Sequence, residues 1–135
     1  MTTPRYLIDS DVCIKAMRRD NESPMRTIRS MAPEGLAISV ITYGEVLEGI
    51  LGTPDPVRNR QRWDEFLAPF YILDVTYPIV EIWGDLRRRL RRKGEGLADA
   101  DTLIGATALY FDMTVVTGNL KHFGRIPGLD IVTPE

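Results

Sequence analysis

The chain has 135 residues, of which 44% are hydrophobic and 27% are charged, and this balance predicts one globular domain, residues 1–135, with a core that needs no disulfide. The formal net charge of −2 gives no basic signature, and no apolar run is long enough to span a membrane, so we expect a cytoplasmic protein and argue nucleic-acid binding from local charge. One cysteine and one histidine exclude an internal disulfide and Cys-His zinc sites, so a bound metal would need oxygen ligands.

Short apolar runs alternate with helical patterns in the first half of the chain. The predicted elements are a strand at 6–8, a helix in which Val12, Ile14 and Met17 recur, a helix at 22–31, a strand at 36–40, and helices at 42–51 and 58–67. Each strand is thus followed by a segment whose apolar residues recur at helical spacing.

The same alternation continues in the second half. The predicted elements are a strand at 71–75, a long helix with Ile79, Trp83, Leu86 and Leu90 on one face, an apolar helix at 99–111, a strand at 114–117, and a fifth strand at 131–132. Strands separated by helices imply right-handed crossovers and a parallel sheet. The predicted fold is a three-layer α/β/α arrangement around a central parallel sheet of four to five strands.

Side chains with oxygen donors lie where the predicted strands end and the helices begin. They are Asp9 and Asp11 after the first strand, Thr42 and Glu45 after the second, Asp99 and Asp101 at the start of the apolar helix, and Thr117 and Asn119 after the fourth strand. In an open parallel sheet, ligands bind outside the carboxyl ends of the strands. We therefore expect these side chains to meet in one crevice.

Each of these residues also has a simpler explanation as a helix cap or a turn. Asp9, Asp11 or Asp99 could cap a helix, Thr42 and Glu45 fit a capping box, and Asn119 suits a turn. If these acids meet in one crevice, however, they repel one another: two carboxylates about 4 Å apart repel by about 4 kcal/mol at an effective dielectric of 20. A helix N-terminus offsets only about 0.3–1 kcal/mol per charge. A hard divalent cation, Mg²⁺ or Mn²⁺, is therefore expected, with Asp101 as a direct ligand and Asp99 nearby.

Four blocks of the sequence resemble the PIN-domain ribonucleases, and in particular the VapC-type toxins of toxin-antitoxin pairs. The blocks are LIDSD at 7–11, ISVITYGEVLEG at 38–49, DADTLIGATA at 99–108 and VTGNLKHF at 116–123. The resemblance implies a PIN-like fold with Asp9, Glu45 and Asp101 as metal-binding acids. Asn119 stands where many members carry a fourth acid, and Asp99 is a candidate for the missing charge. Gly105 replaces a usual alanine, a change expected to affect packing only.

The resemblance also implies an activity and partners. The activity is metal-dependent endonucleolytic cleavage of RNA by activated water, which leaves a 5′-phosphate and a 3′-hydroxyl. The chain would be the toxin of a type II pair, with a small VapB-like antitoxin as its partner and a homodimer as its assembly. An arginine of the antitoxin would pair with carboxylates such as Glu45 and Asp101, and its apolar segment would use the helix at 42–51 and the loop with Pro54 and Pro56.

Six of the seven residues at 87–93 are basic, at the end of the long helix. Those expected to bind RNA phosphates are Arg87, Arg88, Arg91, Arg92 and Lys93. A solvated helix face is an equally good explanation of this run. Arg58, Arg60 and Arg62 could join it. His122 could act as a general base, but activation of water by a bound cation is the stronger hypothesis. The Tyr43 ring could either stack on an RNA base or pack against other side chains of the protein.

Two other functions are compatible with a small α/β chain that has acids at its strand ends. A Mg²⁺-binding phospho-receiver would use Asp74 as a central-strand phosphoacceptor, with Thr117 and Lys121 as accessories. That hypothesis leaves Asp99 and Asp101 unexplained. A catalytically inactive PIN module is the third function, and Asn119 keeps it open. RNA cleavage that depends on metal separates the three.

Overall fold

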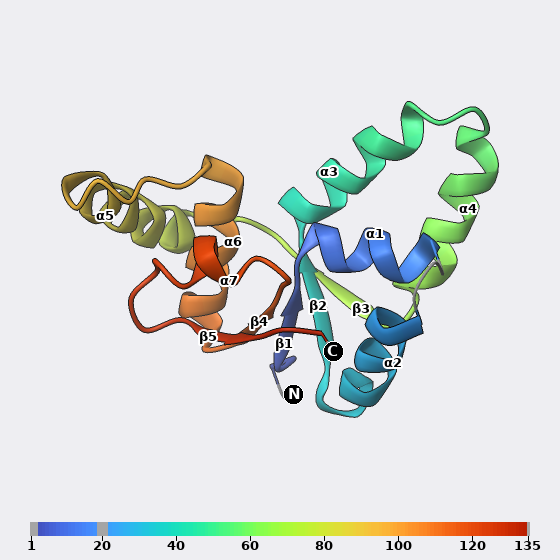
Figure 1. Cartoon of the computed structure of the whole chain (residues 1–135), viewed down its shortest axis with the longest axis horizontal. Coiled ribbons are helices and arrows are strands. Elements are labelled where there is room, and N and C mark those ends of the chain that lie inside the picture. Colours follow the sequence, from blue (N-terminus) through green and yellow to red (C-terminus); the bar gives the residue numbers. More distant parts are fainter. Residues whose placement is uncertain (1–2, 19–21, 135) are drawn as a thin grey trace.

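The computed structural model describes residues 3–18 and 22–134, and it has the predicted three-layer architecture (Figure 1). The elements are β1 (Tyr6–Ile8), α1 (Ser10–Arg18), α2 (Glu22–Met31), a 3-10 turn (Ala32–Glu34), β2 (Leu36–Ser39), α3 (Val40–Leu51), α4 (Pro56–Leu67), β3 (Phe70–Leu73), α5 (Tyr77–Arg92), α6 (Asp99–Phe111), β4 (Thr114–Val116), α7 (Leu120–Phe123) and β5 (Asp130–Val132). All five strands are parallel, in the order β3-β2-β1-β4-β5.

Both faces of the sheet are buried because successive side chains of each strand point to opposite sides. Tyr6 and Ile8 pack with the helices α1 to α4. Leu7, between them, packs with α5, α6 and α7 on the other face. This explains why the central strand reads as an unbroken apolar run rather than an alternating one. The predicted α/β/α fold is confirmed, with five strands.

The chain reverses its direction of travel across the sheet at β1. From β1 it moves outward through β2 to β3, and α5 and α6 then carry it back over the other face to β4. Tyr6 is in register with Leu36 of β2 and with Thr114 of β4. The carboxyl ends of these strands therefore open a crevice at the switch point, where ligands bind in sheets of this kind.

Several element boundaries differ from the prediction. Ser39 is the N-cap of α3, because its Oγ accepts from the Ile41 amide at 3.1 Å. The helix therefore begins at Val40, and the predicted capping box at Thr42 is wrong. The Thr42 side chain is instead fully buried, and its Oγ1 has no hydrogen-bond partner in the described part of the chain.

The other differences are smaller. Asp55 caps α4 by accepting from the Arg58 amide at 3.1 Å, so this helix starts at Pro56, two residues before the predicted start. The strand β3 runs from Phe70 to Leu73 rather than from 71 to 75. The short helix α7 follows Asn119 and was not predicted. Among the described residues, no helix is both long and apolar enough to cross a membrane.

Candidate active site

Asp9 is fixed at the end of the central strand by hydrogen bonds to both of its carboxylate oxygens. Its Oδ1 accepts from the Ser10 amide at 2.7 Å, and its Oδ2 accepts from the Thr117 hydroxyl at 2.8 Å. Asp9 is only 6% exposed, and Thr117 is fully buried. The Thr117 hydroxyl in turn accepts from the amide of Asn119 at 3.0 Å. The loop after β4 therefore sets the orientation of an acid that follows β1.

Glu45 and Asp101 face Asp9 from the helices α3 and α6. Burial raises the pKa of Asp9, and the negative charges of Asp101 and Asp11 raise it further, while the Thr117 and Ser10 hydrogen bonds act in the opposite direction. Glu45 is exposed, but desolvation where α3 meets the crevice raises its pKa, as do the charges of Asp9 and Asp101. Acids from three elements thus repel one another in the crevice.

Asp101 has the most mixed surroundings of the three. Burial raises its pKa, the neighbouring His122 lowers it, and Asp11 raises it. The Nδ1 atom of His122 lies 3.7 Å from Asp101 Oδ2 and 2.7 Å from the side-chain nitrogen of Asn119. His122 and Asn119 therefore form a polar pair beside Asp101. Asn119 therefore contacts neighbours of the acids: its main-chain amide donates to Thr117, and its side chain contacts His122.

Asp99 faces away from these acids. Its Oδ1 lies 2.9 Å from the Nε of Arg87 on α5, and its side chain is 58% exposed. It is the first residue of α6 but makes no capping hydrogen bond within the described residues. Asp99 thus contacts α5, whereas Asp101 borders the crevice. A helical separation of about 200° between residues two apart accounts for this difference.

The donor set suits a hard divalent cation. Within residues 3–18 and 22–134, no three acidic, histidine or cysteine side chains lie close enough to hold an ion as they stand. The donors are nevertheless carboxylate oxygens, which hard divalent cations prefer, and burial together with their neighbours' negative charges raises their pKa values. Asp9, Glu45 and Asp101 are the residues that would hold such an ion.

Two positioning residues were missed or undervalued from the sequence. The amide of Ser10 donates to Asp9, and a side-chain hydrogen bond from Ser10 lowers the pKa of Glu45. The sequence indicates Thr117 only as one oxygen donor among several and as an accessory residue of the phospho-receiver alternative. The signal for Ser10 was its place between Asp9 and Asp11, directly after a buried strand. The signal for Thr117 was weaker, since it depends on β4 lying next to β1.

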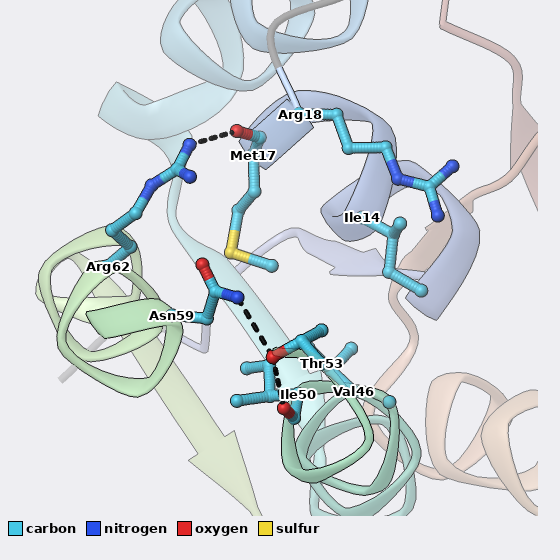
Figure 2. A pocket seen from close by; sticks show the side chains of 9 residues that line it. Ile14, Met17, Arg18, Val46, Ile50, Thr53, Asn59 and Arg62 are labelled. Atoms are coloured by element: carbon cyan, nitrogen blue, oxygen red, sulfur yellow. Dashed lines mark hydrogen bonds between the residues drawn. The ribbon is translucent and has the colours of Figure 1, made fainter. Parts of the chain in front are cut away.

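A second feature is an apolar pocket of about 300 Å³ between α1, α3 and α4 (Figure 2). Its lining residues are Ile14, Met17, Arg18, Val46, Gly49, Ile50, Thr53, Asn59 and Arg62. Arg62 donates to the main-chain oxygen of Met17 at 2.9 Å, and Asn59 donates to the Thr53 hydroxyl at 2.9 Å, so polar contacts close two sides (Figure 2). The helix expected to bind an apolar segment does line this pocket, whereas Pro54 and Pro56 do not.

The basic run lies on the opposite layer, along α5. Arg58, Arg60 and Arg62 are on α4, which covers the other face of the sheet, so they cannot extend this run (Figure 1). Tyr43 also packs: its ring lies 6.0 Å from that of Trp63, and its hydroxyl accepts from Arg60 at 3.0 Å. Asp74, the acid required by a phospho-receiver, follows the edge strand β3 rather than a central strand. That alternative is wrong.

With this geometry in hand, comparison with known proteins identifies the class. Residues 6–129 match the family model described as PIN domain, and the chain belongs to the PIN-domain family. Ribonuclease VapC19 of Mycobacterium tuberculosis is 44% identical over 124 residues, which are 91% of this chain and 95% of that protein. Ribonuclease VapC2 of Rickettsia felis is 30% identical over 125 residues, 92% and 93% of the two chains.

A solved structure agrees with the sequence comparisons. The crystal structure of VapBC2 from Rickettsia felis, bound to a DNA fragment from their promoter, superposes with a TM-score of 0.90 and 28% identity, and the match covers 96% of this chain and 98% of that one. The function predicted from the four sequence blocks, that of a VapC-type ribonuclease toxin, is confirmed at this level.

Proposed function

We propose that the chain, as a single domain of residues 1–135, cleaves RNA endonucleolytically with Mg²⁺ or Mn²⁺ held by Asp9, Glu45 and Asp101. The observation that carries this proposal is Asp9, which is buried, held at both oxygens, and faced by acids from two helices. A bound divalent cation would polarise the phosphodiester, lower the pKa of water and offset charge on the leaving oxygen.

The residues of the chain then have separate tasks. Thr117 and Ser10 hold the Asp9 carboxylate in one orientation, so little has to be reorganised when a cation arrives. Asp99 and Asn119 act from outside the ligand set, Asp99 through Arg87 and Asn119 through His122. The basic run from Arg87 to Lys93 supplies affinity for RNA.

We also propose that the chain is a toxin that acts on RNA in the cytoplasm and is inhibited by a VapB-like antitoxin. The name VapBC2 of the matching structure supports a partner of this kind. The apolar pocket between α1, α3 and α4 would receive a segment of the partner, and the nearby exposed Leu51 and Val57 suit a homodimer contact. An arginine of the partner would enter the acidic crevice and compete with metal.

Cleavage of a labelled RNA tests the catalytic proposal. We expect Asp9→Asn and Asp101→Asn to abolish cleavage that depends on Mg²⁺ or Mn²⁺, because each removes a charged ligand. Asp74→Asn is the matched control, since it makes the same chemical change at the far edge of the sheet. Wild-type rates and an unchanged metal requirement in either active-site variant would refute the ligand assignment.

Co-expression with a VapB-like chain tests the partner proposal. Gly49 lines the pocket, and a Cβ added there meets no atom within 4 Å, so Gly49→Phe should fill the pocket without disturbing the fold. We expect this variant to lose the complex and to keep RNA cleavage. Glu48→Phe adds the same bulk at the neighbouring exposed position, outside the pocket, and should keep the complex. Equal complex formation by both variants would exclude the pocket.

A further inference from the structure

The outer face of α5 carries an open hollow of about 510 Å³ that the proposed catalytic site does not use. It is lined by Trp83, Gly84, Arg87, Arg88, Arg91 and Arg92. These residues recur at intervals of three and four and therefore share one side of the helix. Trp83 lies at the edge of this strip, next to Leu86 and Leu90, which are buried in the core beneath α5. The hollow is thus a solvent-facing strip of arginines with one tryptophan in its lining.

The arginines of α5 differ in their partners. Arg87 pairs with Asp99, and its guanidinium lies 5.3 Å from the centre of the Trp83 ring. Arg89 faces elsewhere and pairs with Asp85 one turn earlier. By contrast, Arg88, Arg91 and Arg92 have no acidic partner in the described part of the chain. Like charges three and four residues apart on a helix repel one another, so an anion bound among them would be stabilising.

Trp83 adds an unsatisfied donor to the lining. Its indole Nε1 is shielded from solvent and has no acceptor among the described residues. The Arg87 guanidinium stacks over its ring. Tryptophan normally finds an acceptor for this group when it is buried. An oxygen-rich ligand that displaced the Arg87 side chain slightly could supply one.

Arg87 links the hollow to the start of α6. Arg87, in its lining, contacts Asp99 at 2.9 Å, and Asp99 opens the same helical turn of α6 that carries Asp101. The two helices α5 and α6 also pack along their length, with Leu86, Leu90, Ile104 and Ala108 in one cluster. A ligand that reaches Arg87 in the hollow would therefore lie beside the start of α6, the helix that also carries Asp101.

We propose that this hollow is a binding site for the phosphate backbone of the RNA substrate, in which Arg88, Arg91 and Arg92 contact phosphates and Arg87 ties the hollow to the first turn of α6. The inference rests on the proposed function, since it extends the substrate path of the same active site. Guanidinium groups match phosphate oxygens in pairs, and a row of them follows a nucleic-acid strand without reading its sequence. An RNA strand is the substrate that such a phosphodiesterase has to bind.

RNA binding in the absence of cleavage tests this inference. We would measure the affinity of a fluorescent single-stranded RNA for the full chain carrying Asp101→Asn, at a series of salt concentrations. Arg91→Gln with Arg92→Gln should lower the slope of log affinity against log salt by about 1.4, because each lost phosphate contact accounts for about 0.7 on a single strand. Arg89→Gln is the matched control: it removes a charge from the same helix but outside the hollow, and should leave the slope unchanged.

The outcomes separate the inference from the function on which it rests. An equal slope for the paired variant and its parent would overturn the hollow as an RNA site, even if the wild-type chain cleaves RNA. An equal fall in slope for Arg89→Gln would overturn it too, because it would show only a general effect of net charge. Loss of antitoxin binding with unchanged RNA binding would assign the strip to the protein partner instead. If the wild-type chain cleaves no RNA with any divalent cation, the proposed function itself fails.

Discussion

Thr117→Val removes the hydroxyl that donates to Asp9 Oδ2 while keeping the shape of a fully buried side chain. The lost bond has a charged acceptor, and hydrogen bonds to charged groups contribute about 1.5–3 kcal/mol. Because a hydrogen-bond partner that orients a metal ligand typically accounts for 10- to 100-fold in metal affinity, we expect the affinity for Mn²⁺ to fall by roughly that factor. The pKa of Asp9 should rise as well, because the Thr117 bond is one of the two contacts that lower it. Protons would then compete with the metal up to a higher pH.

Titration calorimetry with Mn²⁺ and initial cleavage rates would measure this prediction. Thr107→Val is the control, because Thr107 is also fully buried but donates to the main-chain oxygen of Leu103 within α6, at 2.8 Å. It should lose only about 0.5–1.5 kcal/mol of stability and none of the metal affinity. Thr117→Ser should restore most of the wild-type affinity. If Thr117→Val binds Mn²⁺ as the wild type does, Asp9 is not positioned by this bond.

Three further predictions concern stability. Asp101→Asn should raise the free energy of unfolding of the metal-free protein, by an amount on the order of 1 kcal/mol, because it removes a repelling charge. A lower melting temperature than that of the wild type in thermal denaturation would contradict this. Burial raises the pKa of Asp9, Glu45 and Asp101, so the metal-free native state binds more protons than the unfolded state. The free energy of unfolding should therefore fall as pH rises through these raised pKa values. A free energy of unfolding that rises over this pH range in urea denaturation would contradict the raised pKa values. Gly105→Ala places a Cβ against the Cδ1 of Ile126 and should cost about 1–3 kcal/mol, and Ile126→Val, which removes that atom, should recover part of the loss in the double variant.

Topology predicted that the acids would gather at one edge of the sheet, and the resemblance to PIN-domain ribonucleases singled out three of them. Alternating strands and helices imply a parallel sheet, and the carboxyl ends of its strands lie at one edge. Asp9 lies just beyond β1, Glu45 lies in the second turn of the helix that follows β2, and Asp101 lies in the first turn of α6. No knowledge of side-chain contacts was required for that inference. The metal-ligand roles themselves stay predictions.

The contacts that set these acids in place could not be predicted in the same way. Thr117 reaches Asp9 across 108 residues of sequence, and only the adjacency of β1 and β4 brings the two together. Arg87 forms an ion pair with Asp99 because α5 packs on α6, and the periodicity of either helix does not predict that these two helices pack together. The predicted starts of α3 and α4 were wrong for a local reason. Ser39 and Asp55 are good N-cap residues, and they cap these helices ahead of the predicted first residues.

The strand order also determines when during synthesis the enzyme can become active. The first strand made, β1, lies at the centre of the sheet, and its partner β4 is almost the last to leave the ribosome. A nascent chain that ends before β4 already contains Asp9, Glu45 and Asp101, but it lacks Thr117 and the strand that completes the crevice. Such long-range pairing forms late because loop closure must precede it. If Thr117 positions Asp9 as proposed, RNA cleavage therefore requires that β4 has been made and paired with β1.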